Sequence, residues 1–173
     1  ARVISCASVP IVSVTYLPLM PARYISFGTK PRGIPVTYTP ATQDQLLAIR
    51  VNAGIDDLAN SEKFAAAEPD MVEAIVAGIG EFAAGEWAPL NRIGDIEGAK
   101  LENGVVRLPD RFAEAYAHYV EQGWNAISGP VGFGGQGLPF TLSCNVLENL
   151  GTANMAFNLL PMLSVGAIES LDH

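Results

Sequence analysis

The glycine cluster at residues 129–137 is the part of the sequence that most directly suggests chemistry. Gly132, Gly134 and Gly137 have the G-x-G-x-x-G spacing with which a dinucleotide-binding loop brings its backbone close to a pyrophosphate. Such a site also needs a strand before the loop and a helix that opens inside it, whereas here the helix is expected only at Pro139, after the last glycine. We therefore predict an irregular connection in which the glycines allow close backbone approach, and not a phosphate cradle.

Few other side chains could carry catalysis or bind a metal. The two histidines are His118, within a predicted helix, and His173, the last residue. A zinc site needs three or four ligands, and these two histidines cannot complete one, because Cys6 lies in the N-terminal leader and Cys144 in an apolar helix. Cys144 is expected to be a small buried hydrophobe and not a nucleophile, because no nearby cation or histidine favours its thiolate. We predict no metal site and no catalytic residue in this chain.

Length and composition fit one globular domain. The chain has 173 residues, 49% of them hydrophobic, which is enough to build a core and argues against disorder of the main body. The formal net charge is −8. Because nucleic-acid binding depends on neutralising phosphates with Lys and Arg, we exclude a nucleic-acid partner.

Residues 1–38 differ in composition from the rest, since they are basic, rich in proline and free of acidic residues. The uncharged stretch Val3–Ala22 is a poor membrane span because Pro10 and Pro18 interrupt it, and no membrane span is expected elsewhere. We expect this leader to be disordered or not native, with translated upstream sequence as the main interpretation and an organelle transit peptide as the alternative. The corresponding localisations are cytoplasmic and mitochondrial.

From residue 39 onward the sequence predicts helices. Thr42 and Gln45 fit a capping box that opens a helix, which Gly54 ends, and a short helix then carries Ile55 and Leu58. A third helix begins near Pro69. Its apolar residues recur at helical spacing: Val72, Ile75, Val76, Ile79, Phe82 and Ala83.

The second half combines a hairpin with further helices. The Asn103-Gly104 turn signal predicts a small β-hairpin near residues 99–108. A helix is expected from Pro109-Asp110 to Gly123, and two more after the glycine cluster, from Pro139 to about Leu150 and from about residue 153, with a bend at Pro161. In the helix expected between Pro109 and Gly123, one face is expected to hold Phe112, Tyr116, Tyr119 and Val120. The predicted fold class is all-α, an irregular helical bundle with one small hairpin.

The glycine cluster and its flanks together match a known family. Trp124-Asn125-Ala126-Ile127-Ser128 precedes the cluster, Leu138-Pro139-Phe140 follows it, and Cys144 to Asn149 continue the apolar helix. This arrangement resembles the middle of the N-terminal helical domain of the acyl-CoA dehydrogenase family. The segment 82–95 is also similar to the branch that acts on long or sulfur-containing acyl-CoAs, the methylmercaptopropionyl-CoA dehydrogenase type. The cluster departs from the family pattern at Val131-Gly132, where relatives commonly have a glutamate after the proline.

The resemblance implies an FAD-dependent enzyme with an N-terminal helical domain, corresponding here to residues 39–173, a central β-domain and a C-terminal helical domain. In relatives, a glutamate base removes the α-proton, the β-hydrogen leaves as hydride to the flavin, and that glutamate and most flavin contacts lie beyond the corresponding segment. We therefore expect a chain truncated at its C-terminus, inactive alone, whose parent is a homo-oligomer acting on an acyl-CoA substrate. The alternatives are a free-standing helical interaction module and a non-functional fragment.

The family also implies a role for the last helix, which lines the acyl chain in relatives. Matching Gly151 and Gly166 to the family pattern assigns five residues to the acyl-cavity wall: Phe157, Asn158, Pro161, Met162 and Val165. Their spacing places them on one helical stripe that can face one groove. The alternative is that this stripe is ordinary core.

Overall fold

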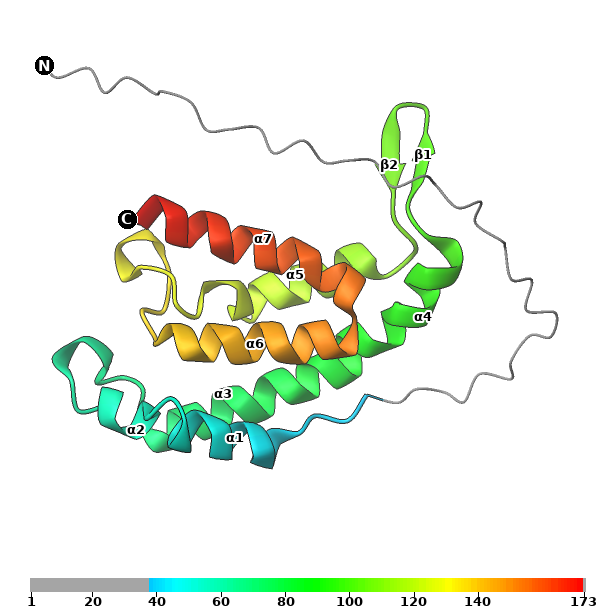
Figure 1. Cartoon of the computed structure of the whole chain (residues 1–173). Coiled ribbons are helices and arrows are strands. Elements are labelled where there is room, and N and C mark those ends of the chain that lie inside the picture. Colours follow the sequence, from blue (N-terminus) through cyan, green and yellow to red (C-terminus); the bar gives the residue numbers. More distant parts are fainter. Residues whose placement is uncertain (1–37, 173) are drawn as a thin grey trace, which may run out of the picture. The chain divides into compact units, whose positions relative to one another are not determined.

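The computed structural model describes residues 38–172, so the interpretations of residues 1–37 and of His173 lie outside the described residues (Figure 1). The elements in chain order are α1 (Thr42–Val51), α2 (Ile55–Leu58), α3 (Pro69–Phe82), α4 (Ala88–Glu97), β1 (Lys100–Glu102), β2 (Val105–Arg107), α5 (Phe112–Glu121), α6 (Phe140–Ala153) and α7 (Met155–Asp172). The predicted fold class is confirmed: the described part of the chain is mostly helical and contains one two-stranded antiparallel sheet.

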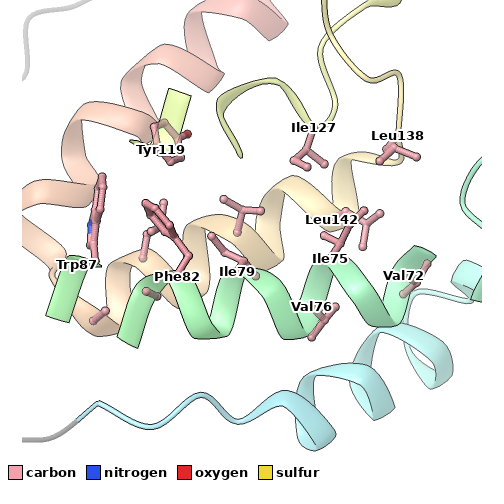
Figure 2. Close-up of a cluster of buried hydrophobic side chains, with 14 of the residues drawn as sticks. Val72, Ile75, Val76, Ile79, Phe82, Trp87, Tyr119, Ile127, Leu138 and Leu142 are labelled. Atoms are coloured by element: carbon pink, nitrogen blue, oxygen red, sulfur yellow. The ribbon is translucent and has the colours of Figure 1, made fainter. Parts of the chain in front are cut away.

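Helix α3 is the centre of the core. All six apolar residues predicted for its inner face are buried, and α3 packs against both α1 and α6. Figure 2 shows Ile75 beside Leu142 of α6 and Val76 on the side of α3 that faces α1, with Ile127 and Leu138 at one end of the cluster and Trp87 and Tyr119 at the other. The helical periodicity of the sequence was sufficient to predict this face, because one stripe of a helix must be buried for the helix to be stable.

A π-helical turn over Ala83–Trp87 joins α3 to α4, and the sequence interpretation contained neither this turn nor α4. Pro89, near the start of α4, has no N–H to donate to the preceding turn, so a regular α-helical bond pattern is interrupted there. A single wide turn accommodates that interruption without ending the helix. Trp87, the last residue of this turn, is fully buried.

The predicted capping box at the start of α1 is wrong. Ala41 occupies the N-cap position and no side chain caps the helix. Gln45 instead turns inward, where its Oε1 accepts a hydrogen bond from Nδ2 of Asn149 at 3.2 Å. Oδ1 of Asn149 in turn accepts a bond of 2.6 Å from the hydroxyl of Tyr38. Tertiary contact with α6 therefore takes precedence over local capping.

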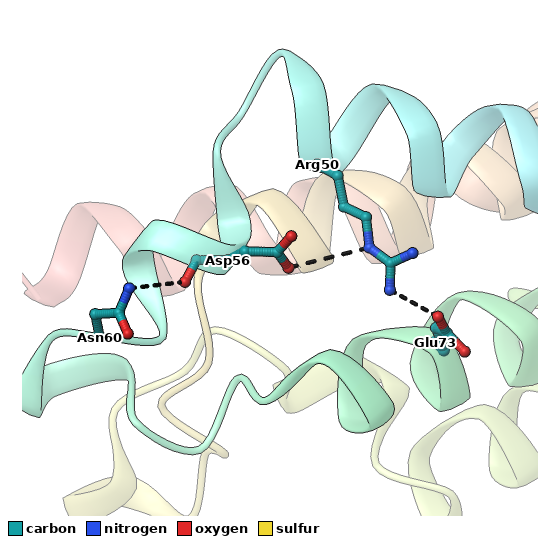
Figure 3. A network of polar contacts seen from close by, with 4 residues as sticks. All are labelled: Arg50, Asp56, Asn60 and Glu73. Atoms are coloured by element: carbon teal, nitrogen blue, oxygen red, sulfur yellow. Dashed lines mark hydrogen bonds and ion pairs between the residues drawn. The ribbon is translucent and has the colours of Figure 1, made fainter.

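Arg50 connects α1 to its two neighbours (Figure 3). Its Nη2 lies 2.7 Å from Oε1 of Glu73 on α3, and its Nε lies 4.0 Å from Oδ1 of Asp56 on α2. Nδ2 of Asn60 donates to the carbonyl of Asp56 at 3.4 Å. These groups are solvent-exposed, so the network fixes orientation more than it adds stability.

The predicted hairpin is confirmed, with Leu101 opposite Val106 and a turn at Asn103-Gly104 in which both residues have positive φ. The helix expected from Pro109-Asp110 begins later, at Phe112, because Arg111 adopts a left-handed conformation immediately before it. Val120 is exposed and not on the buried face predicted for it.

Candidate functional site

The glycine cluster is closed to phosphate. The N–H groups of residues 133–137 all donate to carbonyls within residues 126–131, including Gly135 to Pro130 at 3.0 Å and Gly137 to Gly129 at 2.9 Å. A phosphate cradle needs several free backbone N–H groups that converge on one point. These residues therefore do not fit the pyrophosphate of a dinucleotide or of FAD.

The cluster is a tightly closed connection between α5 and α6. A Cβ on Gly135 would overlap the backbone of Gly129, so the two sides of the loop can come this close only because residue 135 is glycine. Ile127 and Leu138, both buried, are joined at the base of the loop by a backbone hydrogen bond of 3.0 Å. The prediction of close backbone approach is confirmed.

An aromatic cluster forms where α7 begins. The ring of Phe157 stacks on Trp87 with centroids 4.0 Å apart and an interplanar angle of 11°. Phe112 of α5 lies 4.7 Å from Phe157, and Tyr119 lies 5.6 Å from Trp87. Burial in this cluster raises the pKa of Tyr119, with a smaller contribution from Tyr116. Three segments that are distant in the sequence thus meet at one aromatic contact.

Asn154 fixes the start of α7 in this cluster. Its Oδ1 accepts a hydrogen bond of 3.1 Å from the N–H of Phe157, as an N-cap residue does, and its Nδ2 lies 3.4 Å from the carbonyl of Trp87. The sequence interpretation missed this role, although an Asn directly before an apolar helical run is a recognised N-cap signal.

The five residues predicted for the acyl-cavity wall do not share one environment. Phe157, Asn158, Pro161 and Val165 are buried against the rest of the domain, whereas Met162 is 44% exposed on the outer side of α7. Within the described residues, these five therefore do not line one common open cavity. Their contact with an acyl chain stays a prediction.

Asn158 is placed by a close approach of α6 and α7. Its Nδ2 donates to the carbonyl of Leu147 at 3.1 Å and lies where a Cβ on Gly151 would come within 3.0 Å. Its Oδ1 is buried without a partner among residues 38–172. A buried amide oxygen without a hydrogen bond lowers the stability of the folded state, so Asn158 weakens the contact between α6 and α7.

A cleft of about 520 Å³ opens beside the aromatic cluster, and we call it the α4–α7 cleft. Phe112, Phe157 and Leu160 provide its apolar surface. It is also lined by Asn91, Gly94, Asp95, Gly98, Ala99, Leu108, Pro109, Asn154 and Ala156. The lining contains no Lys, Arg or His. Sequence periodicity could not reveal this cleft, because its residues come from four separate segments.

The outer face of α7 is apolar and open. Met155, Leu159 and Leu163 are exposed along it, and the helix has no charged residue before Glu169. An exposed apolar surface of this extent is typical of an interaction site.

Cys144 and the possible metal ligands are the remaining groups that the sequence singled out for chemistry. Cys144 is exposed, which corrects the expectation that it is buried. Partial desolvation and the carboxylate of Glu169 raise the pKa of its thiol, so it remains a poor nucleophile. Across residues 38–172 no three His, Cys, Asp or Glu side chains gather as metal ligands. No helix in the same range is both long and apolar enough to cross a bilayer.

Sequence comparison identifies a relative. No protein-family model matches the chain. It is similar to a curated 3-methylmercaptopropionyl-CoA dehydrogenase of Ruegeria pomeroyi (strain ATCC 700808 / DSM 15171 / DSS-3), with 36% identity over 136 residues. The alignment covers 79% of this chain and 23% of the relative, so the chain spans less than a quarter of that protein. The resemblance deduced from the glycine cluster and its flanks is thereby confirmed, and the chain is a homologue of one part of an acyl-CoA dehydrogenase.

Proposed function

We propose that residues 39–173 are the N-terminal helical domain of an FAD-dependent acyl-CoA dehydrogenase, which introduces an α,β double bond into an acyl-CoA thioester. The observation that carries this proposal is the 36% identity to a 3-methylmercaptopropionyl-CoA dehydrogenase. We further propose that the substrate is 3-methylmercaptopropionyl-CoA or an acyl-CoA of similar size.

The proposed contribution of residues 39–173 is structural, because in the relatives that the chain resembles the catalytic glutamate and most flavin contacts lie beyond the corresponding segment. In the complete homo-oligomeric enzyme, FAD accepts the hydride that leaves the β-carbon, and the β-domain and C-terminal helical domain provide the flavin site and the base that takes the α-proton. Helix α7 forms part of the acyl-cavity wall, with Phe157 facing the α4–α7 cleft and Met162 facing the other domains.

The test is enzymatic. The complete reading frame would be expressed, its flavin absorbance recorded, and the reduction of an artificial electron acceptor measured with a series of acyl-CoAs that includes 3-methylmercaptopropionyl-CoA. We expect acyl-CoA-dependent reduction. A flavin-loaded protein that reduces no acceptor with any acyl-CoA would refute the proposed activity.

A substitution at Met162 tests whether this residue contributes to acyl-chain selection. Met162→Trp enlarges a side chain on the outer face of α7, so we expect kcat/KM to fall for longer acyl-CoAs more than for short ones. Ala167→Trp, at another exposed position of α7, is the control. Equal acyl-chain preference in both variants and the unaltered enzyme would contradict the assignment of Met162.

The open apolar face of α7 supports a second candidate, a helical module that binds a partner helix. A genuine stop codon directly after His173 in the genomic sequence would favour this function. An in-frame β-domain and C-terminal glutamate would exclude it.

A further inference from the structure

We propose that a groove between α1 and α6 binds an arginine residue within an extended segment of a partner protein. The groove has a volume of about 440 Å³, and we call it the α1–α6 groove. It shares no lining residue with the α4–α7 cleft. The proposal is independent of the reaction that the parent enzyme catalyses.

The groove forms because α1 and α6 both pack on α3 without closing on each other. The hydrogen bond of 3.2 Å between Gln45 and Asn149 joins the two helices at one place. On the α1 side the lining includes three alanines, Ala41, Ala48 and Ala53. Because these side chains are small, they leave space between the helices for a ligand.

A buried amide in the lining has no hydrogen-bond partner. Asn145 of α6 is 3% exposed, and neither its Nδ2 nor its Oδ1 is bonded within residues 38–172. Asn149, one helical turn further on, is engaged with Gln45 and Tyr38 instead. Proteins rarely leave both atoms of a buried amide unbonded. A ligand that supplies one donor and one acceptor, as a peptide group does, would satisfy the amide of Asn145.

The rim of the groove is acidic. Asp44 of α1 and Glu148 of α6 line it and are exposed, and neither forms an ion pair within residues 38–172. Arg50, the cation of α1, is held by Glu73 and Asp56 and does not line the groove. The two carboxylates are therefore available to a cation from outside the described residues.

Neighbouring titratable groups sense the same negative charge. Desolvation and, after it, the carboxylate of Glu148 raise the pKa of Tyr38. The pKa of Cys144, which lines the groove, is raised by desolvation and by Glu169. A groove lined by carboxylates without a cation attracts positively charged ligands and repels anions.

The two features together define the ligand. A guanidinium group has several donors in a fixed plane and can bind carboxylates on both sides of a groove, which suits it better than a compact ammonium ion. A free cation would leave the amide of Asn145 without an acceptor and a donor, and an uncharged peptide would leave Asp44 and Glu148 without a counter-charge. An arginine residue inside an extended segment meets all three groups.

The test uses the 173-residue chain, labelled with ¹⁵N, and the capped amino acid N-acetyl-L-argininamide as the probe. Nuclear magnetic resonance would follow the side-chain amide signals of Asn145 during the titration. We expect saturable shifts with the probe and none with N-acetyl-L-citrullinamide, which has nearly the same shape without the charge. Free L-arginine, which lacks both capping amides, should bind with a Kd higher by about fivefold or more.

Three variants assign the contacts. Asp44→Asn and Glu148→Gln should each raise Kd for the probe by about fivefold or more, whereas Asp110→Asn, at an exposed carboxylate outside the groove, should not. Asn145→Leu should also raise Kd by about fivefold or more. Its urea midpoint should be equal to or higher than that of the unaltered chain, because an apolar side chain of similar size replaces an unbonded amide.

Several results would overturn the site. These are the absence of saturable shifts with the probe, equal binding of the citrulline compound, and Kd values for Asn145→Leu and Asp44→Asn that match the Asp110→Asn control. Free arginine that binds as tightly as the capped probe would overturn the protein segment as the ligand. None of these results affects the dehydrogenase assay of the complete reading frame, so the two proposals can fail separately.

Discussion

Replacing Phe157 by alanine tests whether α7 is held by the aromatic cluster. Phe157 is buried at the start of α7, stacked on Trp87 and in contact with Phe112. If this packing exists in solution, the substitution removes a ring from a contact shared by three segments of the chain. If α7 is not packed on Trp87 in solution, little stability is lost.

The expected loss of stability is large. Truncating a buried Phe to Ala costs about 3–5 kcal/mol, a range that includes the cavity left behind. The higher helix propensity of alanine offsets about 0.5 kcal/mol of this. The free energy of unfolding should therefore fall by about 2.5–4.5 kcal/mol. For a protein of this size each kcal/mol corresponds to a change in Tm of about 2–4 °C, so Tm should fall by about 5–18 °C.

The assay is urea unfolding of the purified chain, followed by circular dichroism at a helical wavelength and by tryptophan fluorescence. Leu163→Ala, also on α7 but 70% exposed, is the matched control and should change stability by less than about 1 kcal/mol. A loss below about 1 kcal/mol for Phe157→Ala would refute the packing of α7 on Trp87. It would also make the stripe of four buried residues available to line a cavity.

Three further changes test other parts of the structure. Gly135→Ala should lower the free energy of unfolding in urea by about 2 kcal/mol or more, because the new Cβ overlaps Gly129. Gly132→Ala is the control and should change stability little, because the space around Gly132 is open. Equal effects of the two substitutions would contradict the closed loop. Desolvation and Glu169 raise the pKa of Cys144, so its alkylation at pH 8, followed by mass spectrometry of its peptide, should be slower than that of a free cysteine peptide. In the Glu169→Gln variant the alkylation of Cys144 should be faster than in the unaltered chain. An unchanged rate in the variant would exclude the carboxylate as a cause of the raised pKa. Burial raises the pKa of Tyr119 above its unfolded value of about 10, so the neutral phenol is favoured in the folded state and stability should be lost as pH rises above about 10. Tyr119→Phe should show a smaller loss of urea midpoint between pH 8 and pH 11, and an identical loss would argue against this burial.

The sequence predicted those features that depend on short-range periodicity and turn chemistry. The inner face of α3 follows from apolar residues at helical spacing, and the hairpin follows from Asn103-Gly104, whose positive φ values suit that turn. The rejection of a phosphate site at the glycine cluster was also available from the sequence, because the next helix is expected only at Pro139, after the last glycine. The family resemblance came from the same residues and their flanks.

Local signals failed where a tertiary contact competed with them. The side chain of Gln45 fits a capping box, but its hydrogen bond with Asn149 of α6 holds it in the core. Cys144 follows an apolar pattern, yet it lies on the exposed side of α6. The π-helical turn before Pro89 was missed because it is a compromise between a missing N–H and the packing of Trp87, which no local motif encodes.

For the candidate site as well, some features follow from the sequence alone and others only from the tertiary structure. By itself, the sequence determined which helix carries the predicted acyl contacts and to which family that helix is related, because both depend on residues close together in the chain. Only the tertiary structure decided that Phe157, Asn158, Pro161 and Val165 face the core while Met162 faces outward. It also decided that Phe157 stacks on the buried Trp87 and lines one cleft with Phe112 and the base of the hairpin. The direction in which a helical stripe points depends on what packs against it, and that is set by residues distant in the sequence.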